Sequence, residues 1–110
     1  MELKFTQDVK DAWVAALRSG EYAQGTETLR HPLEENYTEY CCLGVLADVC
    51  GIWSRVYGNE VLKEVKYGSV VSTYILLSEE TQATLTKMND GGASFDHIAG
   101  YITAAVEAQP

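Results

Sequence analysis

The sequence has few basic residues and no long apolar segment. No uninterrupted apolar run approaches the roughly 20 residues that cross a bilayer, so no membrane-spanning helix is expected. Eight Lys and Arg stand against sixteen Asp and Glu, which gives a net charge of −8 and a pI near 4.6. Nucleic-acid backbones and anionic membranes repel such a chain, and direct binding to either is therefore not expected.

Cysteine is also scarce, and its count is odd. The three cysteines, Cys41, Cys42 and Cys50, cannot form a complete set of disulfides, and the first residues lack the basic and apolar parts of a secretion signal. We therefore expect a reducing, cytoplasmic location. All three fall on one expected helix, where adjacent side chains point in different directions, so neither a metal centre nor a cofactor is expected.

The composition is that of one folded domain. Of the 110 residues, 46% are hydrophobic and 22% are charged, as in ordinary globular proteins. A chain of this length can bury one core but not two, so residues 1–110 are expected to form a single domain. A homo-oligomer is compatible with the sequence.

Hydrophobic spacing predicts a first helix from Thr6 to Ser19. Thr6 is suited to cap its start, and Gly20 is suited to end it. The residues expected on its buried face recur at intervals of three and four. They are Val9, Ala12, Trp13, Ala16 and Leu17.

The remaining pattern predicts an α+β fold that is mostly helical. Glu21–Asn36 has no periodicity and is expected to be a surface loop, and the almost wholly apolar Thr38–Gly51 is expected to be a buried helix. Residues 61–75 are rich in β-branched side chains and predict a hairpin. Helices are expected over Glu79–Asn89 and from Ser94 onward. The prediction is four helices, with the short hairpin between the second and the third.

Several motifs along nearly the whole chain carry a resemblance. These are Trp13, Leu17, Gly20, Tyr22, Gln24 and Leu29, the run Tyr40–Leu46, Leu85 and Met88–Gly91, and Ser94, Phe95, Ile98, Ala99 and Ile102. In these motifs the chain resembles a family of small uncharacterised proteins from bacteriophages and bacterial genomes. The resemblance implies a phage origin but no activity. Met88 replaces the leucine that is usual in the pattern, and Ala47 replaces a frequent cysteine.

One hypothesis is a cysteine-dependent hydrolase or transferase. Cys41 or Cys42 near a helix start could become a thiolate, with His31 or His97 as the base. The alternative interpretation is that these cysteines are small apolar core residues. No loop is an obvious oxyanion donor, so no catalytic residue is assigned.

A second hypothesis is a binding protein that sequesters a phosphate-bearing nucleotide signal. The corner around Asn89 and Gly91, followed by a helix start, could present backbone N–H groups to an anion, whereas Asp90 and Asp96 oppose it. The plainer interpretation is a helix-capping corner. The ligand-binding residues of this hypothesis are Arg30, Arg55, Lys66, Asn89, Gly91 and Ser94.

The leading hypothesis is a non-enzymatic phage accessory protein that inhibits a host protein of antiviral defence. Between Glu34 and Tyr40, acids alternate with tyrosines, and tyrosine suits partner contacts because it buries much area with few rotatable bonds. An acidic surface of this kind fits a basic groove on the host protein. The expected partner-binding residues are Glu34, Glu35, Tyr37 and Glu39.

Overall fold

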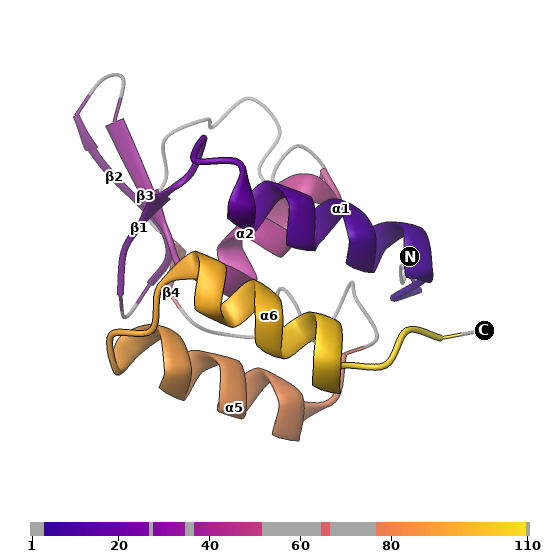
Figure 1. Ribbon diagram of the computed structural model, residues 1–110. Coiled ribbons are helices and arrows are strands. Elements are labelled where there is room, and N and C mark those ends of the chain that lie inside the picture. Colours follow the sequence, from indigo (N-terminus) through magenta and orange to yellow (C-terminus); the bar gives the residue numbers. More distant parts are fainter. Residues whose placement is uncertain (1–3, 27, 35–36, 52–64, 67–76, 110) are drawn as a thin grey trace.

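The protein is built mostly of helices, with a small sheet at one end (Figure 1). The computed structural model describes residues 4–26, 28–34, 37–51, 65–66 and 77–109. The elements in chain order are α1 (Gln7–Arg18), β1 (Ala23–Gln24), β2 (Thr28–Glu34), β3 (Tyr37–Tyr40), α2 (Cys42–Val49), β4 (Val65–Lys66), α5 (Glu79–Asp90) and α6 (Phe95–Ala105). The expected α+β, mostly helical class is confirmed.

The helix boundaries follow from capping side chains. The hydroxyl of Thr6 accepts a hydrogen bond from the Val9 N–H at 3.2 Å, and Ser78 and Ser94 cap α5 and α6 in the same way. Gly20 follows α1 with a φ of 77°, a left-handed conformation that favours glycine. The predicted positions of these three helices are confirmed to within one residue, except at the end of α6, which was left open.

The core is centred on α2. Its residues Cys42 to Ala47 are all buried, and α1 covers one side of them with Trp13, which is fully buried. The Trp13 indole N–H donates to the Cys42 carbonyl at 2.9 Å, and this hydrogen bond fixes the position of α1 relative to the start of α2. In Figure 1, α6 lies beside α1, and α5 lies on the other side of α6. Among the described residues, no helix has the length and apolar character needed to cross a membrane.

The loop expected over Glu21–Asn36 is wrong, because that stretch contains β1 and β2. The sheet order is β1-β3-β2-β4, with β2 antiparallel to β3 and β1 parallel to β3. The strands form because they pair with a partner farther along the chain. Sequence periodicity does not reveal such pairing, and Pro32 next to a register shift hides the alternation further.

The expected start of the second helix at Thr38 is also wrong. Tyr37–Tyr40 forms β3, and α2 begins at Cys42, after Cys41. The Cys41 sulfur accepts a hydrogen bond from the Gly44 N–H at 3.4 Å and so takes the place of the usual N-cap oxygen. Tyr and Thr favour strands, and this preference explains why Tyr37–Tyr40 is a strand and why the helix begins only with the apolar residues after it.

The hairpin expected between the second and third helices lies largely outside the described residues. Within 61–75 the structure describes β4, Val65–Lys66, which is antiparallel to β2. The three other described strands lie between α1 and α2. The sheet of the described residues is therefore centred on the β2–β3 pair, and this pair positions the candidate site.

Candidate functional site

The two adjacent cysteines have structural contacts. Cys41 and Cys42 are 1% and 0% exposed, and the Cys42 thiol donates weakly to the Leu85 carbonyl at 3.7 Å. Burial raises the pKa of the Cys42 thiol, which disfavours the thiolate that a nucleophile needs. A substrate cannot reach either sulfur in this fold. Cys41 caps the start of α2 and Cys42 is the first residue of that helix, so both residues have structural roles in this fold.

The side chain of Asn89 lies inside the protein and joins three segments. Its Oδ1 accepts from the Cys42 backbone N–H at 3.2 Å and from Gln24 Nε2 at 3.0 Å. Its Nδ2 donates to the Gly25 carbonyl at 2.8 Å. Asn89 is 0% exposed, so its amide holds α5, α2 and the end of β1 together.

Gln24 completes this connection to α6. Its Nε2 also donates to the Ala93 carbonyl at 2.7 Å, and its Oε1 accepts from the Phe95 N–H at 3.1 Å. The amide of Gln24 thus bonds the corner between α5 and α6 to β1. We call Gln24 and Asn89 the amide staple, and sequence analysis noted both residues without predicting this contact.

The residues of the phosphate hypothesis do not gather around one cavity in the described part of the chain. Asn89 faces the core, and the Ser94 hydroxyl caps α6 through the His97 N–H at 3.1 Å. Arg30 is 3% exposed on β2, and Lys66 is the last residue of β4. Gly91 lies at the end of α5, and Arg55 is outside the described residues.

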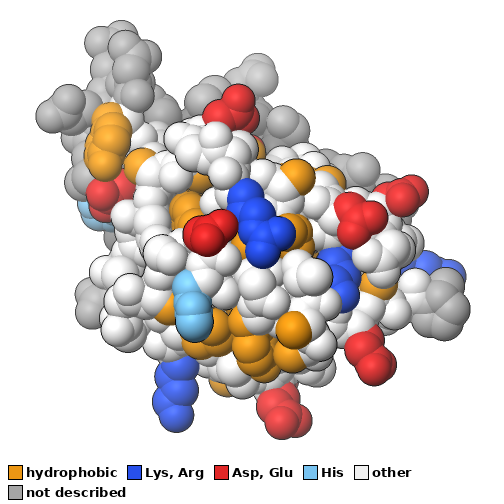
Figure 2. Space-filling model, viewed as in Figure 1, with side chains coloured by type: hydrophobic (Ala, Val, Ile, Leu, Met, Phe, Trp, Pro, Cys, Tyr) orange, Lys and Arg blue, Asp and Glu red, His pale blue; other side chains and the backbone are white. Residues whose placement is uncertain are grey.

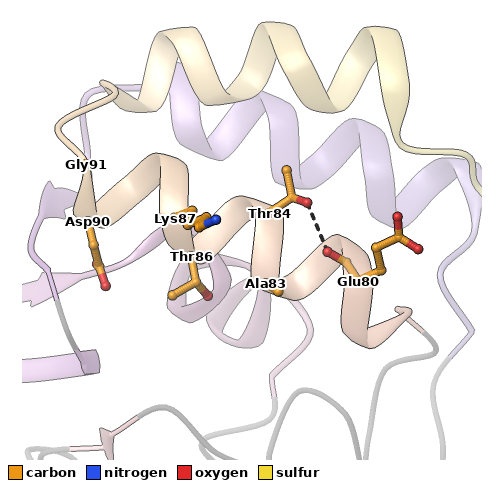
Figure 3. A pocket seen from close by; sticks show the side chains of 7 residues that line it. All are labelled: Glu80, Ala83, Thr84, Thr86, Lys87, Asp90 and Gly91. Carbon is orange, nitrogen blue, oxygen red and sulfur yellow. Dashed lines mark hydrogen bonds between the residues drawn. The ribbon is translucent and has the colours of Figure 1, made fainter.

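A surface hollow does lie along α5, next to this corner (Figure 3). Its charged side chains are two carboxylates, Glu80 and Asp90, and one ammonium group, Lys87. In Figure 3 the labelled side chains project from α5, with Gly91 directly after its end, and the Thr84 hydroxyl donates to the Glu80 carbonyl at 3.0 Å. With more negative than positive charge, this hollow does not suit a phosphate.

The described residues also hold no group of three or more His, Cys, Asp or Glu side chains placed to bind a metal ion.

The expected partner-binding residues lie on the β2–β3 pair, with Glu35 outside the described residues. Glu34 is opposite Tyr37 in the register, and His31 is opposite Glu39. Tyr40 packs against the core and stacks edge-on with Tyr22 at 5.1 Å. Since neighbouring residues of a strand point to opposite faces, Tyr37 and Glu39 lie on the outer face of β3.

Tyr37 and Glu39 form an ordered pair on this surface. The Tyr37 hydroxyl donates to Glu39 Oε2 at 3.2 Å. Tyr37 is 45% exposed, and it is the exposed large hydrophobic residue of the described chain. We call this surface the Tyr37–Glu39 face. In the view of Figure 2, hydrophobic and acidic side chains occur together at the projecting strands in the upper left, and the Lys and Arg side chains in view lie over the helices.

Gly25 lies beside this pair and was not singled out by sequence analysis. A Cβ at Gly25 would be 2.8 Å from Glu39 Cβ and 3.2 Å from Glu39 Oε1. The missing side chain therefore lets Glu39 lie flat across the end of β1. One weak signal of this role is present in the sequence, a glycine in an irregular segment, but such glycines are common in loops.

Comparison with family models places residues 5–67, more than half of the chain, in a domain family of unknown function, DUF8296, and the chain belongs to this family. No curated protein and no solved structure matches this chain. The matched segment contains α1, the described strands and α2, and so it includes the Tyr37–Glu39 face.

Proposed function

We propose that the protein is a non-enzymatic binding protein whose Tyr37–Glu39 face docks on a basic surface of another protein. The observation that carries this proposal is the pairing of an exposed tyrosine ring with a carboxylate on a projecting strand. Tyrosine is enriched where proteins meet, because its ring contributes a large contact area and its hydroxyl still finds a polar partner.

Charge supports a basic partner. The net charge of −8 attracts a positively charged surface over several ångströms and raises the rate of encounter. Arg30, the cation nearest in sequence to this face on β2, is 3% exposed and opposite Tyr40, whose ring packs on the core side. Its guanidinium group is therefore on the core side of the sheet and is not part of the outer surface.

The biological setting of the proposal follows from the resemblance to phage proteins. In that setting the protein acts in the cytoplasm of an infected cell, and its partner is a host protein, with an antiviral defence enzyme as the favoured target. Docking of the acidic face over a basic nucleic-acid groove would block that groove and so inhibit the enzyme. No nucleic acid or membrane is needed for this activity.

The two alternative functions have less support. A cysteine enzyme needs a thiolate that substrate can reach, whereas Cys41 and Cys42 are buried. A nucleotide-binding protein needs several cations around one cavity, whereas Arg30 and Asn89 are buried and the hollow on α5 carries more negative than positive charge. No observation favours either over protein binding.

The test is capture of host proteins by the tagged protein and by two charge-reversed variants. Glu34→Lys/Glu39→Lys reverses two of the acids assigned to partner binding, and Glu21→Lys/Glu107→Lys reverses two exposed acids elsewhere. Both variants move the net charge from −8 to −4, since each reversal adds 2. We expect a basic partner to be retained by the wild type and by the second variant, and lost by the first. Equal capture by both variants would refute the proposal.

A further inference from the structure

The position of Glu39 depends on a hydrogen bond at one carboxylate oxygen and on the missing side chain of Gly25 beside the other. On one side, the Tyr37 hydroxyl donates to Oε2 at 3.2 Å. On the other, the side chain passes over Gly25, where an added Cβ would be 3.2 Å from Oε1. A carboxylate at a protein surface normally samples many rotamers, so the hydrogen bond from Tyr37 to the half-buried Glu39 reduces the entropy lost when a partner binds.

The backbone under Glu39 is also fixed. The Gly25 N–H donates to the Tyr40 carbonyl at 2.8 Å, and the Gly25 carbonyl accepts from the buried amide of Asn89 at 2.8 Å. Gly25 is itself buried. The backbone of Gly25, which lies under Glu39, is therefore bonded to the core through the amide staple. A ligand at the Tyr37–Glu39 face contacts a rigid surface.

We propose that the Tyr37–Glu39 face is an arginine-binding site, which selects a guanidinium group over an ammonium group. This inference rests on the proposed function and specifies the chemistry of the partner. A guanidinium plane can stack on an exposed aromatic ring while its N–H groups donate to a neighbouring carboxylate in fixed directions. A lysine ammonium is a point charge, and it gains less from the fixed geometry of a ring beside a carboxylate.

The arrangement gives each residue a separate role. The Tyr37 ring offers the stacking surface, since it is 45% exposed. Glu39 supplies the acceptor, because hydrogen bonding to Tyr37 occupies only part of the acceptor capacity of its two oxygens. Gly25 is a positioning residue, which does not touch the ligand but leaves room for Glu39 to lie beside the ring.

The experiment is a titration of the isotope-labelled full chain with two short peptides, followed by the backbone amide signals in NMR spectra. The peptides are acetyl-Gly-Arg-Gly-Arg-Gly-amide and the same sequence with lysine in place of arginine. Because their charges are equal, general attraction to an acidic protein affects both alike. We expect the arginine peptide to shift the amides of Tyr37 and Glu39 and to bind about tenfold more tightly, the ratio for one additional charge-assisted hydrogen bond.

Three variants locate the selectivity. Glu39→Gln keeps the size of the side chain but removes its charge, and we expect it to bring the arginine-to-lysine affinity ratio close to one. Glu21→Gln makes the same change at an exposed residue and should leave the ratio intact. Gly25→Ala should lower the ratio by displacing Glu39, while leaving the signals of α5 and α6 in place. If Gly25→Ala does not fold, Glu39→Gln still decides the question.

The outcomes separate this inference from the proposed function. Equal affinities of the two peptides at the Tyr37–Glu39 face would overturn the arginine selectivity and leave the acidic docking face standing. Shifts spread over distant acids, with none at Tyr37 or Glu39, would overturn the site itself. Loss of partner capture on reversal of Glu34 and Glu39 would still support the proposed function in the first case.

Discussion

The amide of Asn89 gives the sharpest test of how this fold is held together. Replacing Asn89 with alanine removes the acceptor of the Cys42 N–H and the donor to the Gly25 carbonyl. Cys42 is the first residue of α2, so its N–H has no partner within the helix. Both backbone groups belong to buried residues, so each loses its partner within the protein.

The expected loss of stability is large for a domain of this size. A buried polar group without a partner costs about 1–3 kcal/mol, so the two groups together cost about 2–6 kcal/mol. The total stability of such domains is about 5–15 kcal/mol. Gln24 also loses one partner, but it keeps its hydrogen bonds to Ala93 and Phe95. Its loss is therefore not included in the expected change in the free energy of unfolding.

The variant Asn89→Asp tests the same hydrogen bonds through the pH dependence of its free energy of unfolding. The introduced carboxyl has nearly the same shape, but when ionised it cannot donate to the Gly25 carbonyl. It is also buried, next to Asp90 and in the last turn of α5, where the helix dipole disfavours negative charge. These causes raise its pKa in the folded state above the unfolded value of about 3.9.

The sign of the pH dependence follows from that shift. Above the folded-state pKa, the folded protein must carry a buried charge, and the variant is destabilised in full. As the pH falls through the folded-state pKa towards the unfolded value, the folded state binds the proton first, and the deficit relative to wild type shrinks. A protonated carboxyl can again donate to the Gly25 carbonyl, which restores the bond.

The assay is urea unfolding of wild type, Asn89→Ala and Asn89→Asp, with Lys87→Ala as a control on the exposed side of the same helix. The control should change the free energy of unfolding by less than about 0.5 kcal/mol. The reasoning is refuted if Asn89→Ala costs no more than the control, or if the deficit of Asn89→Asp grows on acidification.

Two further predictions concern the buried side chains around α2. Trp13→Phe removes the donor to the Cys42 carbonyl and part of a fully buried ring, and it should lower the free energy of unfolding by about 2–4 kcal/mol in the same urea assay. A change below about 0.5 kcal/mol, which is less than one hydrogen bond contributes, would contradict the contact. Alkylation at neutral pH, followed by mass spectrometry, should label the partly exposed Cys50 in the folded protein but Cys41 and Cys42 only after unfolding, and rapid labelling of Cys42 would revive the enzyme hypothesis.

The helices were predictable because their signals are local. Thr6, Ser78 and Ser94 cap helices through bonds that span three residues, and Gly20 ends α1 by its own conformation. Each such signal can be read within one turn of chain. The start of α2 at Cys41 was not predictable in this way. A cysteine sulfur is a weak helix cap, and the strand preference of Tyr40 competes with the helical pattern of the apolar residues that follow.

The sheet was not predictable in the same way. β1 has two residues, and it exists because Ala23 pairs with Glu39, which is sixteen positions away. The amide staple joins Gln24 to Asn89 across 65 positions. Pairings at such distances depend on how the helices pack, and no period or cap in the local sequence reports them.

The candidate site lies between these two cases. Closeness in sequence was enough to group Glu34, Tyr37 and Glu39 as one acidic, aromatic segment. It could not show that Tyr37 and Glu39 share the outer face, because the segment was expected to be a loop running into a helix. Nor could it show the role of Gly25, which depends on the close approach of β1 to Glu39.

The segment that defines the family does not hold this face by itself. Residues 5–67 include Gln24, Gly25 and the Tyr37–Glu39 face, but Asn89 and Phe95 come from α5 and α6. Without those helices the Gly25 carbonyl and the Cys42 N–H lose their partner, and the floor under Glu39 loses its bond to the core. Cys42 and the amide staple connect α5 and α6 to the matched segment. They hold the backbone under Glu39 in place, so the proposed face depends on helices that lie outside the matched segment.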